Sequence, residues 1–367
     1  MTTARRTESH VKDISYHGGV DEEKLSKGAE YAKKIKRMSA TGRSLKSMLR
    51  YLRVSDGQRA AKEFWPVYKE SLGLDGYVIV ETAPMVNSNT AAIFREACYT
   101  WRRLGSPNAM LSLPATDEHL LAIQKLSGAG INTSVCGMYT QARYRKAAEA
   151  YIAGLEARHD SGDRLDLLVS EVHLELLPVD SLFDPILSGI TKQDGSGSDK
   201  ARQLIGKVAI ANAYLIYLQH QELFESERFG RLAAFGANPQ RLVWSNTDND
   251  CLSFDPLKYP PIRQSSATVG LLPQKLLAEN IKGTIKWYRD DTCLRSALDV
   301  IDRLQSELNV DLGVLMGKLE HQALCLRQKR YQRLLDILGQ KVDEFLTLPV
   351  AYKTARTEMV LAGNLNS

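Results

Sequence analysis

The sequence lacks the features of a membrane or secreted protein. It contains no run of about 18 apolar residues, so no segment is long enough to span a bilayer as a helix. The first ten residues, MTTARRTESH, lack the apolar stretch of a secretory signal. Five cysteines are spread along the chain without CxxC spacing, which argues against a zinc or disulfide framework and favours reduced thiols. We therefore expect a soluble, cytoplasmic protein without membrane contact.

A strong charge imbalance is also missing. The net charge is +5 over 367 residues, and basic side chains are interspersed with acidic ones. The densest basic cluster lies among leucines at helical spacing, which predicts a solvated helix face and not a nucleic-acid site; it comprises Arg327, Lys329, Arg330 and Arg333. The expected partner is a small-molecule substrate, and a homo-oligomer stays an open alternative.

Short apolar runs alternate with segments of helical period, which is typical of successive βα units around a parallel sheet. The pattern predicts seven strands, near residues 12–17, 77–81, 109–113, 132–137, 167–176, 240–246 and 267–271. No GxGxxG motif follows the first strand, so a closed (β/α)8 TIM barrel is favoured over an open doubly wound sheet. We divide the chain into an N-terminal arm (1–10), a barrel (11–345) and a C-terminal tail (346–367).

Polar side chains occupy the interior face of several predicted strands. In LVSEVHLELL (168–177), alternation places two acids and an imidazole on one face and three aliphatic side chains on the other: Glu171, His173 and Glu175, against Val172, Leu174 and Leu176. The aliphatic face should pack on helices, so the polar face is directed into the barrel. Buried carboxylates without partners cost several kcal/mol each, so these acids must be paired, protonated or metal-bound.

The stretch NAMLSLPATDEHLLAIQKLSGAGINTSVCGMYTQARYRKAAEAYIAGLEAR resembles the part of transaldolases that runs from their reactive-lysine strand through the next strand and its helix. The resemblance covers residues 11–345, in motifs that follow the order of that family. The preceding strand is similar to GYVIVETAP, and later segments are similar to LIGKVAIANAYLIYLQHQELF, FGANPQRLVWSNT and GLLPQKLLAENIKG. The resemblance implies a transaldolase-like barrel. The family's first strand has no counterpart here, so that strand is missing or replaced, for example by the tail or a neighbouring subunit.

The resemblance also implies a changed active site. In the family, the strand similar to NAMLSLPAT carries a lysine that forms a Schiff base with a ketose phosphate, and here that position is Ser112. An iminium accepts the electron pair of a breaking C–C bond, and a hydroxyl cannot do so. No other predicted strand carries a lysine near its C-terminal end. Lys12 belongs to a predicted strand but lies at its N-terminal end. We therefore expect no transaldolase activity.

Other site positions of the family are partly replaced. Glu81 matches the acid/base glutamate of the family, whereas Ser134 and Cys136 stand where transaldolases carry an Asn and a Thr that serve substrate and water. His17 lies near a further Asn position, and His173 replaces a Ser. The altered set predicts a polar pocket with different chemistry.

The phosphate ligands of the family are missing as well. Pro178 stands in place of an arginine that holds the substrate phosphate, and the strand near 240–246 ends in SNTDND without a basic residue. Arginine forks and ammonium groups are how proteins bind phosphate dianions. The expected substrate is therefore a non-phosphorylated molecule.

Three interpretations stay open. The first is a repurposed enzyme, of the kind used in specialised metabolism, in which Glu81 and His173 perform acid–base chemistry on a neutral or cationic small molecule. The second is a metal-assisted lyase or aldolase, with a divalent ion held by Glu81, Glu171, His173, Glu175 and His17; no other cofactor is expected. The third is a non-catalytic pseudoenzyme that serves in binding or assembly. The expected substrate contacts are Ser112, Ser134, Cys136, Glu171, Glu175, Asn246 and His17.

Overall fold

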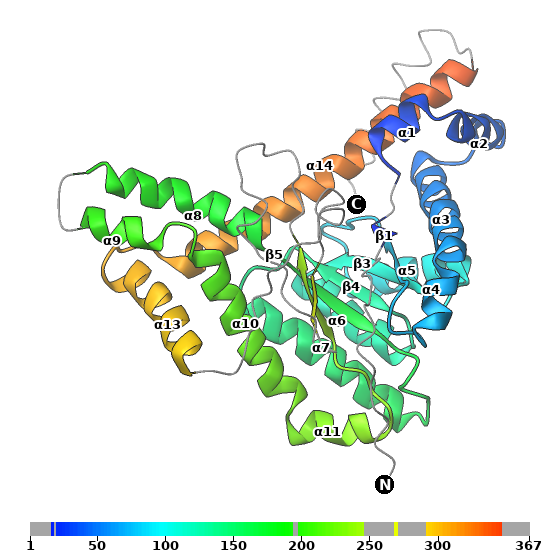
Figure 1. Ribbon diagram of the computed structural model, residues 1–367. Helices are drawn as coiled ribbons and strands as arrows, with labels where there is room; N and C mark the ends of the chain where they lie inside the picture. The colour runs from blue at the N-terminus through cyan, green and yellow to red at the C-terminus, as the bar shows by residue number, and fades with distance from the viewer. Residues whose placement is uncertain (1–15, 18–19, 194–196, 246–267, 271–290, 347–367) are drawn as a thin grey trace.

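A sheet of seven parallel strands in sequential order forms the centre of the molecule (Figure 1). The computed structural model describes residues 16–17, 20–193, 197–245, 268–270 and 291–346. The strands are β1 (Tyr16–His17), β2 (Val78–Glu81), β3 (Ala109–Pro114), β4 (Thr133–Cys136), β5 (Ser170–Glu175), β6 (Arg241–Ser245) and β7 (Thr268–Gly270). Each lies within one residue of a predicted strand, which confirms the βα pattern. Within the described ranges no strand joins β7 to β1.

Helices follow the strands and cover the outside of the sheet (Figure 1). They are α1 (Glu22–Lys27), α2 (Ala29–Ser39), α3 (Leu45–Glu63), α4 (Trp65–Glu70), α5 (Thr90–Leu104), α6 (Asp117–Gly128), α7 (Gln141–Asp160), α8 (Leu176–Thr191), α9 (Gly197–Leu204), α10 (Val208–Phe224), α11 (Glu227–Ala234), α13 (Asp291–Ser306) and α14 (Leu312–Leu346). Thr116 and Thr140 cap α6 and α7 through their side chains, as their positions after a strand predict. None of these described helices has the length and apolar character needed to cross a membrane.

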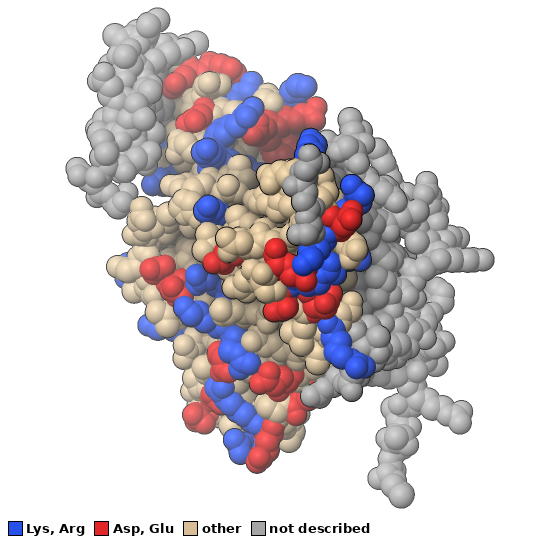
Figure 2. Space-filling view, turned by 90° about the vertical axis from the view of Figure 1, so that its left-hand side faces the viewer, with Lys and Arg blue, Asp and Glu red and all other residues tan. Residues whose placement is uncertain are grey.

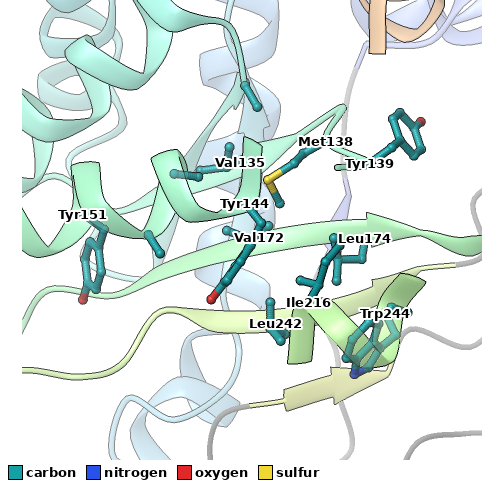
Figure 3. Packing of buried hydrophobic residues seen from close by; sticks show 14 of the residues in the cluster. Val135, Met138, Tyr139, Tyr144, Tyr151, Val172, Leu174, Ile216, Leu242 and Trp244 are labelled. Atoms are coloured by element: carbon teal, nitrogen blue, oxygen red, sulfur yellow. The ribbon is translucent and has the colours of Figure 1, made fainter. Parts of the chain in front are cut away.

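The outward faces of the strands form the main hydrophobic core. Val135, Val172 and Leu242, on three neighbouring strands, are fully buried and belong to one apolar cluster with Tyr144 of α7 and Ile216 of α10 (Figure 3). Leu176, expected at the end of β5, is instead the first residue of α8. The strand alternation therefore works as predicted, with aliphatic side chains against the helices and polar ones inside.

Helix α14 is the element that bears most directly on the site. It runs obliquely across one end of the sheet, from the region of α8 and α9 to α1 and α2 (Figure 1). Its C-terminal half packs Leu334, Leu335 and Leu338 into a second cluster with residues of α1, α2 and α3. Helix α14 ends at Leu346, and the arm 1–10 and the residues from 347 onward lie outside the described residues. On the face seen in Figure 2, acidic and basic side chains are interspersed.

Candidate active site

Strands β2 to β5 bring four polar residues to one level of the sheet. In the parallel ladder Glu81 lies beside Ser112, Ser112 beside Ser134, and Ser134 beside Glu171. Side chains alternate along a strand, and the outward positions are taken by the core, so these four are directed to the interior. The sequence pattern predicted this gathering of Glu81, Ser112, Ser134 and Glu171.

Ser112 is met by a guanidinium group that the sequence pattern placed on a solvated helix face. Arg327 of α14 donates through Nη2 to the Ser112 carbonyl oxygen at 2.9 Å and through Nη1 to the Ser112 Oγ at 3.3 Å. The solvated-face prediction is therefore wrong for Arg327, although Lys329, Arg330 and Arg333 are exposed. Arg327 lies on the same helix face as Leu319 and Ala323. A charged residue on this otherwise apolar face is the sequence feature that indicates the inward position of Arg327.

The Arg327 guanidinium also contacts the end of β4. Its Nη1 donates to the Cys136 Sγ at 2.6 Å, and this sulfur lies 3.7 Å from the Ser112 Oγ. Burial raises the pKa of the Cys136 thiol, while Arg327 acts in the opposite direction. Burial lowers the pKa of Arg327, but Cys136, Glu81 and Glu175 outweigh it, so the net pKa is raised and the group stays charged. The Arg327 Nε–H is buried and finds no acceptor in the described part of the chain.

Glu81 is half-buried and lies between arginines. Its Oε2 lies 3.3 Å from Nη2 of Arg53 on α3, and its Oε1 lies 3.9 Å from Nη1 of Arg330 on α14. Arg53 is 6 % exposed and its Nη1 also donates to the carbonyl oxygens of Glu81 and Thr82. Burial lowers the pKa of Arg53, and Glu81 opposes that shift. The carboxylate expected to act as acid or base is thus held in place by cations.

The acids and the imidazole of β5 are partnered, as their burial requires. His173 Nε2 lies 2.7 Å from Glu171 Oε1, and both side chains are almost fully buried. Glu175 is half-buried at the strand end, and its Oε2 accepts a hydrogen bond from the Tyr139 hydroxyl. The two buried groups form a pair inside the barrel, whereas Glu175 reaches its open end.

A cavity of about 600 Å³ opens at this end of the barrel, and we call it the mouth cavity. Of the residues predicted to form the site, Glu81, Cys136 and Glu175 line it. His173, Ser112, Ser134 and Glu171 are not among its lining residues, and so a direct contact of His173 with a ligand there has no support. Asn246 lies outside the described residues, and so does the side chain of His17.

The charged lining of the mouth cavity is acidic on balance. Three guanidinium groups face five carboxylates; they are Arg143, Arg327 and Arg330, against Glu81, Asp117, Glu118, Glu175 and Glu320. Arg143 is occupied by Asp117 at 2.7 Å and approaches Glu320 at 3.5 Å. Pro178, at the family's phosphate-ligand position, also lines the cavity. No lysine is present among these described lining residues.

Helix α14 is anchored over the mouth by Glu320. Its Oε1 accepts hydrogen bonds from the backbone N–H groups of Tyr139 and Thr140, at 3.3 Å and 3.2 Å, and from the Thr140 hydroxyl at 2.9 Å. These donors form the N-terminus of α7, where a negative charge is favourable. Glu320 and Arg327, two turns apart, therefore fix α14 to the ends of β3 and β4.

A metal centre finds no ready ligand set in the described ranges. No group of three His, Cys, Asp or Glu side chains suited to a metal ion is present among those residues. Of the ligands predicted from sequence, Glu171 and His173 pair with each other, and Glu175 pairs with Tyr139.

A parallel sheet of βα units with a polar cavity at the C-terminal strand ends is the architecture of a TIM barrel. The family model described as Transaldolase/Fructose-6-phosphate aldolase matches residues 21–233. The chain is 30% identical over 321 residues to a transaldolase of Saccharopolyspora erythraea, covering 87% of this chain and 85% of that protein. It is 28% identical over 337 residues to a transaldolase of Trichodesmium erythraeum, covering 91% and 89%. The chain therefore belongs to the transaldolase/fructose-6-phosphate aldolase family, and the transaldolase-like barrel predicted from sequence is confirmed.

Proposed function

We propose that this barrel is a repurposed enzyme that acts without a Schiff base on a small, non-phosphorylated carbonyl compound. The observation that carries the proposal is the Arg327 guanidinium beside Ser112, with a buried Nε–H that has no acceptor in the described part of the chain. Its relatives are named transaldolases, and the reaction of that family needs an amine where this chain has a hydroxyl. In this proposal the positive charge of Arg327 takes the role that the iminium group has in the family, which is to stabilise the electron pair released on the substrate.

The proposed step is a proton transfer next to the substrate carbonyl. Glu81, held by Arg53 and Arg330, takes a proton from the carbon beside the carbonyl group. The electron pair of that C–H bond moves to the carbonyl oxygen, and Arg327 stabilises the negative charge that develops there. Return of a proton to the same carbon completes an exchange with solvent. In a hydroxyketone, a proton shift between the two oxygens followed by protonation of the neighbouring carbon completes an isomerisation. The paired His173 and Glu171 support the end of β5 as positioning residues in this scheme.

The charge of the mouth cavity supports a substrate without phosphate. Carboxylates outnumber guanidinium groups in its lining, and Arg143 is already paired. Both Nη groups of Arg327 are engaged by Ser112 and Cys136, so Arg327 does not present the free fork of donors that a phosphate dianion uses. A neutral or cationic compound therefore fits best.

Hydrogen–deuterium exchange into a small hydroxyketone tests this function. Dihydroxyacetone in D2O, followed by proton NMR, reports proton abstraction without a second substrate. We expect the protein to exceed the buffer rate, and Glu81→Gln and Arg327→Met each to lower that rate by about a hundredfold. Arg333→Met is the matched control, because Arg333 lies on the same helix outside the mouth cavity and is exposed. Exchange that survives Glu81→Gln, or a rate no higher than buffer with a panel of such ketones, would contradict the proposal.

A second candidate is a pseudoenzyme whose barrel serves in binding or assembly. It is favoured by the way α14 fills the mouth with its own groups, since Arg327 is bonded to Ser112 and Cys136 while Glu320 is bonded to α7. In that case no ketone exchanges, and Arg327→Met alters stability alone. The same pair of variants therefore separates the two candidates.

A further inference from the structure

A second cavity lies on the other side of α14 from the mouth cavity. It measures about 690 Å³ and is lined by residues of α3, of the loop 82–89 between β2 and α5, and of α14. Glu81 borders both cavities. We call this space the α3–α14 cavity.

The charge of the α3–α14 cavity is opposite to that of the mouth cavity. Four cationic side chains line it against two carboxylates; they are Lys46, Arg50, Arg53 and Lys329, against Glu81 and Glu96. Each arginine has one carboxylate partner, since Arg50 Nη1 lies 2.6 Å from Glu96 and Arg53 Nη2 lies 3.3 Å from Glu81. The two lysines make no ion pair within the described residues. An excess of two positive charges is therefore left to face the cavity.

Arg53 gives this cavity a buried, fixed cation. Its guanidinium is held by two backbone carbonyl oxygens, and its Nε–H finds no acceptor in the described part of the chain. Its charge also lies near those of Arg327 and Arg330, which add to burial in lowering its pKa. A bound anion would reduce this repulsion between like charges.

We propose that the α3–α14 cavity binds a phosphate group, free or as the monoester of a small metabolite. Two ammonium groups that form no ion pair with the described residues, beside a buried guanidinium, match a phosphate dianion in charge and in number of donors. The cavity is large enough for a small organic phosphate. The site lies on the β2 side of the barrel, away from Pro178 in the first turn of α8. It does not depend on the chemistry proposed for Ser112 and Arg327.

Isothermal titration calorimetry of the full chain tests the site. The probes are inorganic phosphate, fructose 6-phosphate and unphosphorylated fructose. Lys46→Gln combined with Lys329→Gln should weaken binding of both phosphate probes about tenfold, and fructose should not bind. Lys62→Gln combined with Lys318→Gln is the matched control, because it removes the same charge from the same two helices outside this cavity. The control should bind within about twofold of the wild-type protein.

The outcomes separate this site from the mouth cavity. Tighter binding of fructose 6-phosphate than of inorganic phosphate would support a monoester ligand, and equal binding would support free phosphate. Three results would each overturn the proposal. They are an equal loss of phosphate affinity in both lysine double variants, no binding of either phosphate probe up to about 10 mM, or a loss of affinity in Arg327→Met alone. The readout is binding and not turnover, so failure of the carbonyl chemistry would leave this result intact.

Discussion

Replacing Glu320 with alanine should loosen helix α14 over the barrel mouth. One carboxylate oxygen of Glu320 accepts three hydrogen bonds at the N-terminus of α7, from the two amides and the hydroxyl of Tyr139 and Thr140. Because this contact joins elements that are about 180 residues apart in the chain, nothing local replaces it. Arg327, one turn beyond Ala323 on the same helix face, should be released together with it.

The size of the effect follows from the contacts. A hydrogen bond to a charged group contributes about 1.5–3 kcal/mol, and a charge at a helix N-terminus adds about 0.3–1 kcal/mol. The Glu320 side chain is 16% exposed and one oxygen shares three donors, so we discount their sum to about 2 kcal/mol for Glu320→Ala. Glu320→Gln keeps an acceptor and loses the charge, so about 1 kcal/mol is expected.

Amide hydrogen exchange read by mass spectrometry measures this loosening. A loss of 2 kcal/mol in the free energy of local opening corresponds to about 30-fold faster exchange of the α14 amides, and 1 kcal/mol to about fivefold. Glu344→Ala is the control on the same helix, because Glu344 is exposed and, within the described residues, forms an ion pair with Lys341 alone, at 3.0 Å. Unchanged protection of α14 in Glu320→Ala, or a loss spread evenly over the chain, would refute the anchoring role.

Two further predictions concern the fold. Burial lowers the pKa of His220 to about 3, below that of the unfolded chain, so the unfolded state binds more protons and stability falls with pH below 6.5. The loss of stability is about 2 kcal/mol at pH 5. His220→Gln keeps a hydrogen-bond partner for the Tyr144 hydroxyl and should reduce, by this amount, the difference between the free energies of unfolding at pH 7.5 and pH 5. If the difference stays the same in the variant, the titration of His220 is not its cause. Gly57→Ala should lower the free energy of unfolding, measured in urea, by about 1–3 kcal/mol, because the new Cβ would lie 2.6 Å from Val80 Cγ2. In Gly317→Ala the new Cβ meets no atom of the described residues within 4 Å, so the variant should be as stable as the wild-type protein or more stable. Equal effects of the two glycine changes would contradict the packing.

Local sequence pattern was enough to predict the strands and the interior polar residues. The stretch 108–116 contains β3 (Ala109–Pro114) and ends on Thr116, which caps α6; both features depend on neighbouring residues. Alternation also predicted that Glu171 and His173 share one buried face, where they pair with each other. Alternation does not show how deep in the barrel a side chain lies, and so it did not predict that His173 is absent from the lining of the mouth cavity.

The position of Arg327 could not be predicted in this way. Arg327 is 215 residues away from Ser112 in the chain, and its contact depends on the path of α14 across the barrel end. That path is set by long-range packing of Leu334 and Leu338 on α1 to α3. A guanidinium on an apolar helix face was the only local indication.

The proposal that this chain forms no Schiff base is tested most directly by borohydride reduction in the presence of fructose 6-phosphate, followed by intact-mass measurement. A hydroxyl at Ser112 and the absence of lysine from the described lining of the mouth cavity predict an unchanged mass. A transaldolase with the family's lysine should gain the reduced adduct under the same conditions. A trapped adduct on any lysine of this chain would contradict the replacement of an amine by a fixed cation.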